Sequence, residues 1–108
     1  MPTLYLSAPT SRTQVGTDVF YKDFYTILRS HVGPDYAIYS SIAAQIHPGI
    51  HVVVFDRDRR LQAEGTISSV VPKPSNRVQR YDIGVPDLKQ VRYTGAIPPV
   101  NRCGVALV

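Results

Sequence analysis

The segment PGIHVVVFDRDRRLQAEGTISSVV, residues 48–71, decides the fold of this chain. It begins with a Pro-Gly turn. Residues 50–55 are then apolar or β-branched at nearly every position, which is typical of a strand buried on both faces. Residues 56–60 form a charged loop, and residues 61–71 alternate apolar and polar side chains as a half-buried strand does. The segment therefore predicts a β-hairpin.

The sequence before this hairpin predicts one strand and one helix. Residues 3–8 alternate with a period of two, which indicates a strand. From residue 17 to residue 32 the apolar side chains recur every three or four positions, as in an amphipathic helix. Thr17 or Asp18 is the expected N-cap, and Gly33-Pro34 is expected to end the helix.

The remaining segments predict further short strands. We expect them over residues 36–40, 77–85, 89–94 and 103–108, while residues 42–46 are ambiguous and suit one helical turn. So many short strands in a small chain favour a curled or closed sheet, because closure removes exposed edges. The predicted fold is one α+β domain over residues 1–108, with a small mixed, strongly curved sheet or barrel and an N-terminal amphipathic helix.

Composition limits the class of protein. The chain has 108 residues, of which 44% are hydrophobic and 19% charged, which is ordinary for a globular domain. Its single cysteine, Cys103, cannot form an internal disulfide, which favours a reducing compartment such as the cytoplasm. The first residues do not suggest a signal peptide, and no apolar run approaches the length of a membrane span.

Charge points weakly to an anionic partner. The formal net charge is +4, and most of the basic residues are arginines, which suit contacts with phosphates and base edges. Lys73, Arg77 and Arg80 are balanced nearby only by Asp82, so we expect them to form an electrostatic footprint. The arginines within residues 56–60 alternate with aspartates and are expected to form a solvated loop.

Residues 46–56 and 59–67 resemble the core hairpin of the PUA-like superfamily, which includes the PUA, ASCH and EVE domains. The shared pattern is an apolar residue before Pro-Gly, an aliphatic strand, a polar turn, and a second strand with a small residue and a glycine. Gly65 would let this strand bend or approach another backbone closely. The resemblance implies a partner that is RNA or DNA, or a modified base held in a pocket beside the barrel.

The resemblance to the PUA-like superfamily also indicates, by position, which residues of this chain would line the pocket. An unpaired base needs an aromatic face and polar groups for its edge, while basic side chains contact phosphates. A tyrosine in a sheet is also commonly a half-buried strand residue whose hydroxyl reaches water, and that alternative applies to each tyrosine here. The candidate binding residues are Ser7, Thr10, Ser11, Arg12, Tyr39, Ser40, Lys73, Arg77, Arg80 and Tyr81.

Two other functions remain open. Some ASCH-like domains are suggested to cleave RNA, and His51, Lys73, Arg77 and Tyr81 would be the acid–base candidates if they met in space. A homodimer or other interaction module would use Phe20, Tyr21 and Tyr25 on an exposed part of the helix. We predict no catalytic motif, no cofactor and no metal site. His47 and His51 have the spacing of a helical zinc pair, but Pro48-Gly49 between them prevents a helix.

Overall fold

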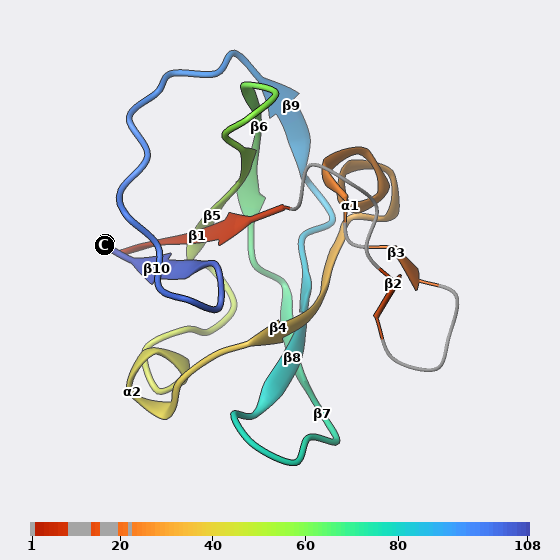
Figure 1. The fold of residues 1–108 in the computed structure, drawn as a ribbon, viewed down its shortest axis with the longest axis vertical. Helices are drawn as coiled ribbons and strands as arrows, with labels where there is room; N and C mark the ends of the chain where they lie inside the picture. The colour runs from red at the N-terminus through yellow and green to blue at the C-terminus, as the bar shows by residue number, and fades with distance from the viewer. Residues whose placement is uncertain (1, 9–13, 16–19, 22) are drawn as a thin grey trace.

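The computed structural model describes residues 2–8, 14–15, 20–21 and 23–108. They form a mixed α+β fold, with most strands in two separate sheets and with short helices beside them (Figure 1). A further pair of short strands, β2 (Gln14–Val15) and β3 (Phe20–Tyr21), is antiparallel.

The first sheet has the strand order β10-β1-β5-β6-β9. Its central strand, β5 (His51–Asp56), is buried from Val52 to Asp56, as expected for a strand covered on both faces. β5 pairs in parallel with β1 (Thr3–Ser7) and antiparallel with β6 (Leu61–Thr66). The predicted hairpin is therefore confirmed. The edges are β9 (Lys89–Val91) and β10 (Val105–Leu107).

The second sheet has the order β4-β8-β7 and is antiparallel. It consists of β4 (Val32–Ala37), β8 (Arg80–Gly84) and β7 (Ser69–Lys73). The prediction of one continuous strand over residues 61–71 is wrong, because the chain leaves the first sheet after Thr66 and enters the second at Ser69. The strand expected at residues 36–40 begins earlier, at Val32, and ends at Ala37.

The helix is shorter than its periodicity suggested. α1 covers Phe24–Ser30, and Asp23 caps it by accepting a hydrogen bond from the Thr26 amide at 2.9 Å. Phe20 and Tyr21 belong to β3, so the prediction that the helix over residues 17–32 includes them is wrong. The expected caps, Thr17 and Asp18, lie outside the described residues. The chain turns at His31, which has a φ of 61°.

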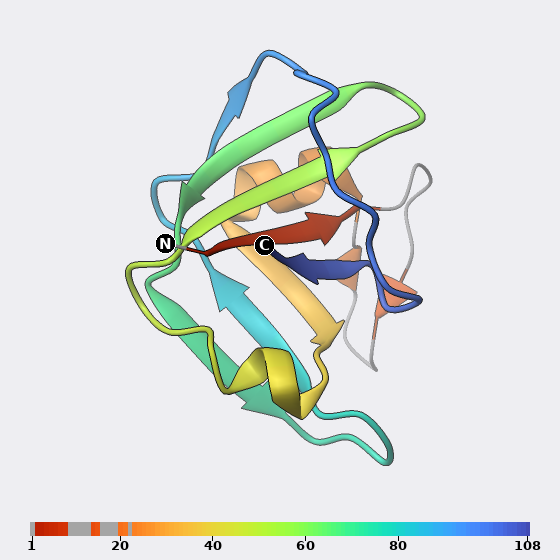
Figure 2. The same cartoon turned by 90° about the vertical axis from the view of Figure 1, so that its left-hand side faces the viewer.

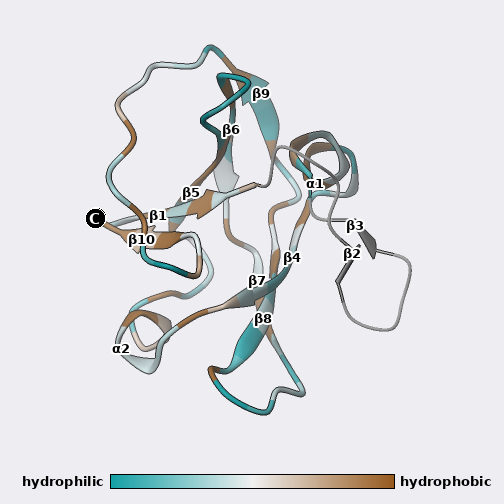
Figure 3. Ribbon diagram, in the orientation of Figure 1, coloured by the Kyte–Doolittle hydropathy of each residue, from teal (hydrophilic) through white to brown (hydrophobic). Residues whose placement is uncertain are grey.

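One hydrophobic core joins both sheets and α1. In Figure 2, β5 and β6 lie above β4, β8 and β7, and α1 packs near β4 and β5. Apolar colour is seen on β5, β10 and parts of β1, whereas the loop between β7 and β8 is mostly hydrophilic (Figure 3). The fully buried core side chains include Leu4, Leu6, Phe24, Ile27, Tyr36, Ile38, Val52, Val54, Ala63 and Ile83.

Hydrogen bonds continue each sheet up to the point where the chain passes from one to the other. The Ile67 amide donates to Ile50 O at 2.9 Å, and the next amide, that of Ser68, donates to Gly84 O at 2.8 Å. Gly65 lies near the end of β6, just before the chain passes from the first sheet to the second. A Cβ on it would lie 2.5 Å from a methyl carbon of Val85, so the glycine is required by close packing. In the described part of the chain, the strands do not form one closed sheet.

None of the helices formed by the described residues has the length and apolar character that crossing a membrane requires.

Candidate functional site

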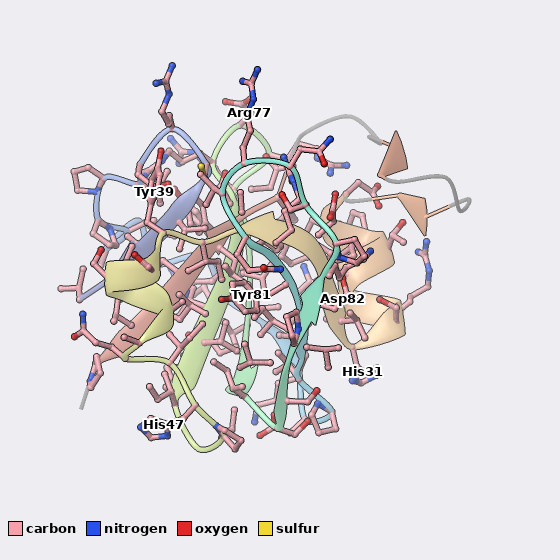
Figure 4. All side chains as sticks on the ribbon, turned by 90° about the horizontal axis from the view of Figure 1, so that it is seen from below. His31, Tyr39, His47, Arg77, Tyr81 and Asp82 are labelled. Atoms are coloured by element: carbon pink, nitrogen blue, oxygen red, sulfur yellow. The ribbon has the colours of Figure 1, made fainter. Side chains whose placement is uncertain are left out.

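A concave hollow lies between the segment that enters α2 (Ser40–Ala43) and the loop that joins β7 to β8. Its volume is about 510 Å³, within the range of small-molecule pockets. Four of the predicted binding residues line it: Tyr39, Ser40, Arg77 and Tyr81. In Figure 4, Tyr39 precedes α2, Tyr81 lies on β8, and the side chain of Arg77 extends outward from the loop between β7 and β8. The remaining lining residues are Ile38, Val78 and Gln79.

Backbone hydrogen bonds fix the Tyr39 wall of the hollow. Tyr39 precedes α2 in an extended conformation, with φ −60° and ψ 148°, and its carbonyl oxygen accepts the amides of Ile42 and Ala43 at 3.0 and 2.9 Å. The neighbouring Ile38 is buried, and its amide donates to Gln79 O at 3.0 Å. This last bond joins the two walls of the hollow directly.

The Tyr39 side chain is held by a third segment. A side-chain hydrogen bond with Cys103 raises the pKa of Tyr39, and the positive charge of nearby Arg102 opposes that shift. Tyr39 is 38% exposed, so part of its ring stays open to solvent. Cys103 was expected within a buried strand; it precedes β10 in a turn and is only partly buried.

The basic residues around the hollow differ in how far their charge is compensated. Lys73 Nζ lies 3.6 Å from Asp82 Oδ1, and Arg80 Nη1 lies 3.5 Å from Asp35 Oδ2 and 2.9 Å from Asp35 O. The expectation that Asp82 is the only acid near this set is therefore wrong, since Asp35 joins it. Arg77 is exposed and forms no ion pair with any residue that the structure describes.

A second, shallower hollow adjoins the first through Arg77. It has a volume of about 370 Å³ and lies under the tip of the loop between β7 and β8. Arg77 and Arg80 both line it, with Asp35 on one side. The two hollows together form a surface that runs from Tyr39 past Arg77 to Arg80, and the guanidinium of Arg77 belongs to both.

Among the other predicted binding residues that the structure describes, Ser7 does not line this hollow. Ser7 ends β1, where its carbonyl oxygen accepts a hydrogen bond from Tyr36 and its amide donates to Gly104 O at 2.8 Å, and it does not line the hollow. Thr10, Ser11 and Arg12 lie outside the described residues. The prediction that Ser7 joins the tyrosines in one pocket is therefore not met.

His51 belongs to a separate hollow on the first sheet, of about 420 Å³, which Asp87 and Lys89 also line. His51 Nε2 lies 2.7 Å from Glu64 Oε1, and the buried Gln62 amide donates to Glu64 Oε2 at 3.0 Å. Because His51 is in this hollow while Arg77 and Tyr81 are in the other, the acid–base set expected for a ribonuclease is not assembled.

The segment with His47 and His51 forms no helix, as Pro48-Gly49 indicated, and the helix face expected for a dimer is not formed as predicted. The segment between His47 and His51 is a turn followed by a strand, and among residues 2–8, 14–15, 20–21 and 23–108 no three His, Cys, Asp or Glu side chains gather as metal ligands would. Of the aromatic residues expected on an exposed helix face, only Tyr25 lies on α1.

Sequence reasoning missed three residues at the main hollow. Gln79 lines it, and Cys103 and Arg102 reach Tyr39 from the turn before β10. No local pattern links residues 102–103 to residue 39, so no sequence signal was available for them. Gln79 lies within the predicted strand over residues 77–85, and a polar residue between two arginines was a weak signal.

No protein family model, curated protein or solved structure matches this chain.

Proposed function

We propose that this chain is a non-catalytic module that binds nucleic acid or a modified nucleotide in the hollow between Tyr39 and Arg77. One observation carries the proposal: Tyr39, Ser40, Arg77 and Tyr81, which come from separate segments, line a single concave surface. Aromatic rings offer stacking faces to an unpaired base, hydroxyl groups offer hydrogen bonds to its edge, and a guanidinium without a carboxylate partner suits a phosphate.

Charge supports an anionic ligand. Arg77 and Arg102 are both exposed, and Arg102 is close enough to Tyr39 to affect its titration. Lys73 and Arg80 are partly neutralised by Asp82 and Asp35, so they add less to the local potential. The ligand would therefore have its base at Tyr39 and its phosphates along Arg77.

A PUA-like relationship is part of this proposal. In that view the two sheets correspond to the small curved sheet or barrel of such domains, and the chain works in the cytoplasm on RNA or DNA. The proposal is supported by the confirmed hairpin, by the close packing at Gly65, and by the direct passage of the chain from the first sheet to the second at Ile67 and Ser68.

The test is fluorescence anisotropy with labelled single-stranded RNA and DNA oligonucleotides, titrated at several salt concentrations. We expect micromolar binding that weakens as salt increases, because association releases counterions. Arg77→Ala should weaken binding about tenfold and reduce the salt slope by about one. The matched control is Arg92→Ala, which removes the same charge from an exposed site just beyond β9. β9 and the β7–β8 loop lie at opposite ends of the molecule's long axis (Figure 1).

Other outcomes would contradict the proposal or favour one of the two alternative functions. Absence of binding, or equal losses in the Arg77 and Arg92 variants, would overturn it. Cleavage of the oligonucleotide that disappears in His51→Ala would favour the ribonuclease. A dimer in size-exclusion chromatography without any nucleic-acid binding would favour the interaction module.

A further inference from the structure

The amide group of Gln79 has a fixed orientation at the edge of the hollow. Its Nε2 donates to the carbonyl oxygens of Lys73 and Arg80, the second at 3.0 Å. Because both partners are acceptors, only the NH₂ end of the amide can face them. The oxygen, Oε1, must therefore point away from them, and it accepts no hydrogen bond from any residue within the described ranges.

This leaves a defined acceptor beside an aromatic face. Gln79 and Tyr39 line the same hollow, and the backbone bond from Ile38 to Gln79 O keeps their segments together. The hydroxyl groups of Ser40 and Tyr81 complete the polar lining, and either can act as donor or acceptor. Among the side-chain groups of this lining, Oε1 is the one that can only accept; Gln79 is exposed, so a ligand that donates to Oε1 takes the place of water.

We infer that the hollow holds one unpaired base that carries an exocyclic amino group (cytosine, adenine or guanine, but not uracil), stacked on Tyr39 with its amino group donating to Gln79 Oε1. This inference rests on the proposed function and specifies the ligand of the same site. Cytosine N4 and adenine N6 are donors at the corner of the base. Uracil has a carbonyl oxygen where cytosine has N4, and its N3–H lies between two carbonyl oxygens that would both face Oε1.

The same geometry selects single strands. In a duplex both faces of the base are stacked, so the Tyr39 ring cannot stack on it without unpairing and flipping the base. An unpaired base in a single strand or loop presents both an open face and its amino group, while its flanking phosphates can reach Arg77 on the exposed rim.

The decisive experiment compares oligo(C) with oligo(U) RNA of equal length in the anisotropy assay. Cytosine and uracil are rings of the same size, so a difference between them reports the amino group rather than general stacking. We expect the unmodified chain to bind oligo(C) more tightly than oligo(U) by up to about tenfold, the upper end of the net effect of one hydrogen bond that replaces a bond to water. A C·G duplex should bind more weakly than either.

Two variants test the role of Gln79. Gln79→Ala removes the amide, and Gln79→Met keeps the length of the side chain without its acceptor. Both should bring oligo(C) and oligo(U) to equal affinity. Because both also remove the Nε2 bonds to Lys73 O and Arg80 O, the readout is the ratio of the two affinities within each variant, in which a general change of the loop cancels. Gln90→Ala, in the exposed middle of β9, is the matched control and should retain the preference.

The results separate this inference from the proposed function. Equal, Arg77-dependent binding of oligo(C) and oligo(U) would overturn the selectivity and leave nucleic-acid binding standing. A preference for oligo(C) that survives in both Gln79 variants would overturn the role of Oε1. Failure to bind any oligonucleotide would overturn both.

Discussion

The phenolic hydroxyl of Tyr36 donates a hydrogen bond to the carbonyl oxygen of Ser7 at 2.9 Å. Tyr36 lies in β4 of the second sheet and Ser7 ends β1 of the first, so this bond crosses between the sheets. Tyr36 is fully buried. The bond therefore stabilises the arrangement of the two sheets from inside the core.

Replacing Tyr36 by phenylalanine should destabilise the fold while keeping its packing. The variant loses the hydroxyl and leaves the Ser7 carbonyl without this donor, which should cost about 1–3 kcal/mol in the free energy of unfolding. Urea denaturation followed by circular dichroism measures the change. Tyr93→Phe, at a partly exposed position beyond β9, is the control and should change stability little. Equal stability of the two variants would contradict the role given to the Tyr36 hydroxyl.

Stability should also fall at alkaline pH because of Tyr36. Burial raises the pKa of Tyr36 above its ordinary value, so the folded state keeps this proton when the unfolded state has lost it. The contribution is complete below the unfolded pKa of about 10 and is lost as pH rises beyond it. Unfolding measured between neutral pH and pH 11 should show this decline, and Tyr36→Phe should show a shallower one. Parallel curves would contradict the assignment.

Gly65→Ala should destabilise more than Gly84→Ala. A Cβ at residue 65 would lie 2.5 Å from Val85 Cγ1 and 3.1 Å from the backbone Cα of Leu88, and the backbone cannot move away easily. Overpacking of this kind costs about 1–3 kcal/mol. At Gly84 the nearest atom is the hydroxyl oxygen of Ser69, which can rotate away. Thermal unfolding of the two variants checks the order, and the reverse order would contradict it.

Asp56→Ala should destabilise the β5–β6 hairpin. The Asp56 carboxylate is 1% exposed; it accepts the amides of Asp58 and Arg59 at 3.1 and 3.2 Å and the Arg59 Nε at 2.7 Å. Removing these charge-assisted bonds should cost about 2–3 kcal/mol in the free energy of unfolding. Asp58→Ala, at the exposed tip, is the comparison and should cost less; urea denaturation of both variants would show whether this order holds.

Local patterns predicted the hairpin but not the change of sheet. The alternation of residues 61–71 is interrupted only at Ser69 and Val70, and this one irregularity does not indicate that β6 and β7 pair with different partners. Gly33-Pro34 was taken as a helix stop, although Pro34 lies inside β4. β4 is at the edge of its sheet, and an edge strand tolerates proline because its amide need not join the ladder. The strand's place in the sheet decides this, and it is not a local property.

The helix was overextended for a related reason. Phe20, Tyr21, Phe24 and Tyr25 satisfy a helical period, and a short run of aromatic residues suits a strand equally well. The local signal for the true start of α1 was Asp23, whose carboxylate accepts a hydrogen bond from the amide three residues later. At the site, Tyr39 and Arg77 could be predicted by residue type, while Cys103 could not, because only tertiary folding brings it to Tyr39.

The backbone bond between Ile38 and Gln79 has a consequence for affinity. Because this bond already joins the two sides of the hollow in the free protein, the proposed binding site is preorganised. Little backbone entropy would then be lost when a ligand binds. Discrimination between guests then depends on how well each one matches a rigid surface, and not on how far the surface can adapt.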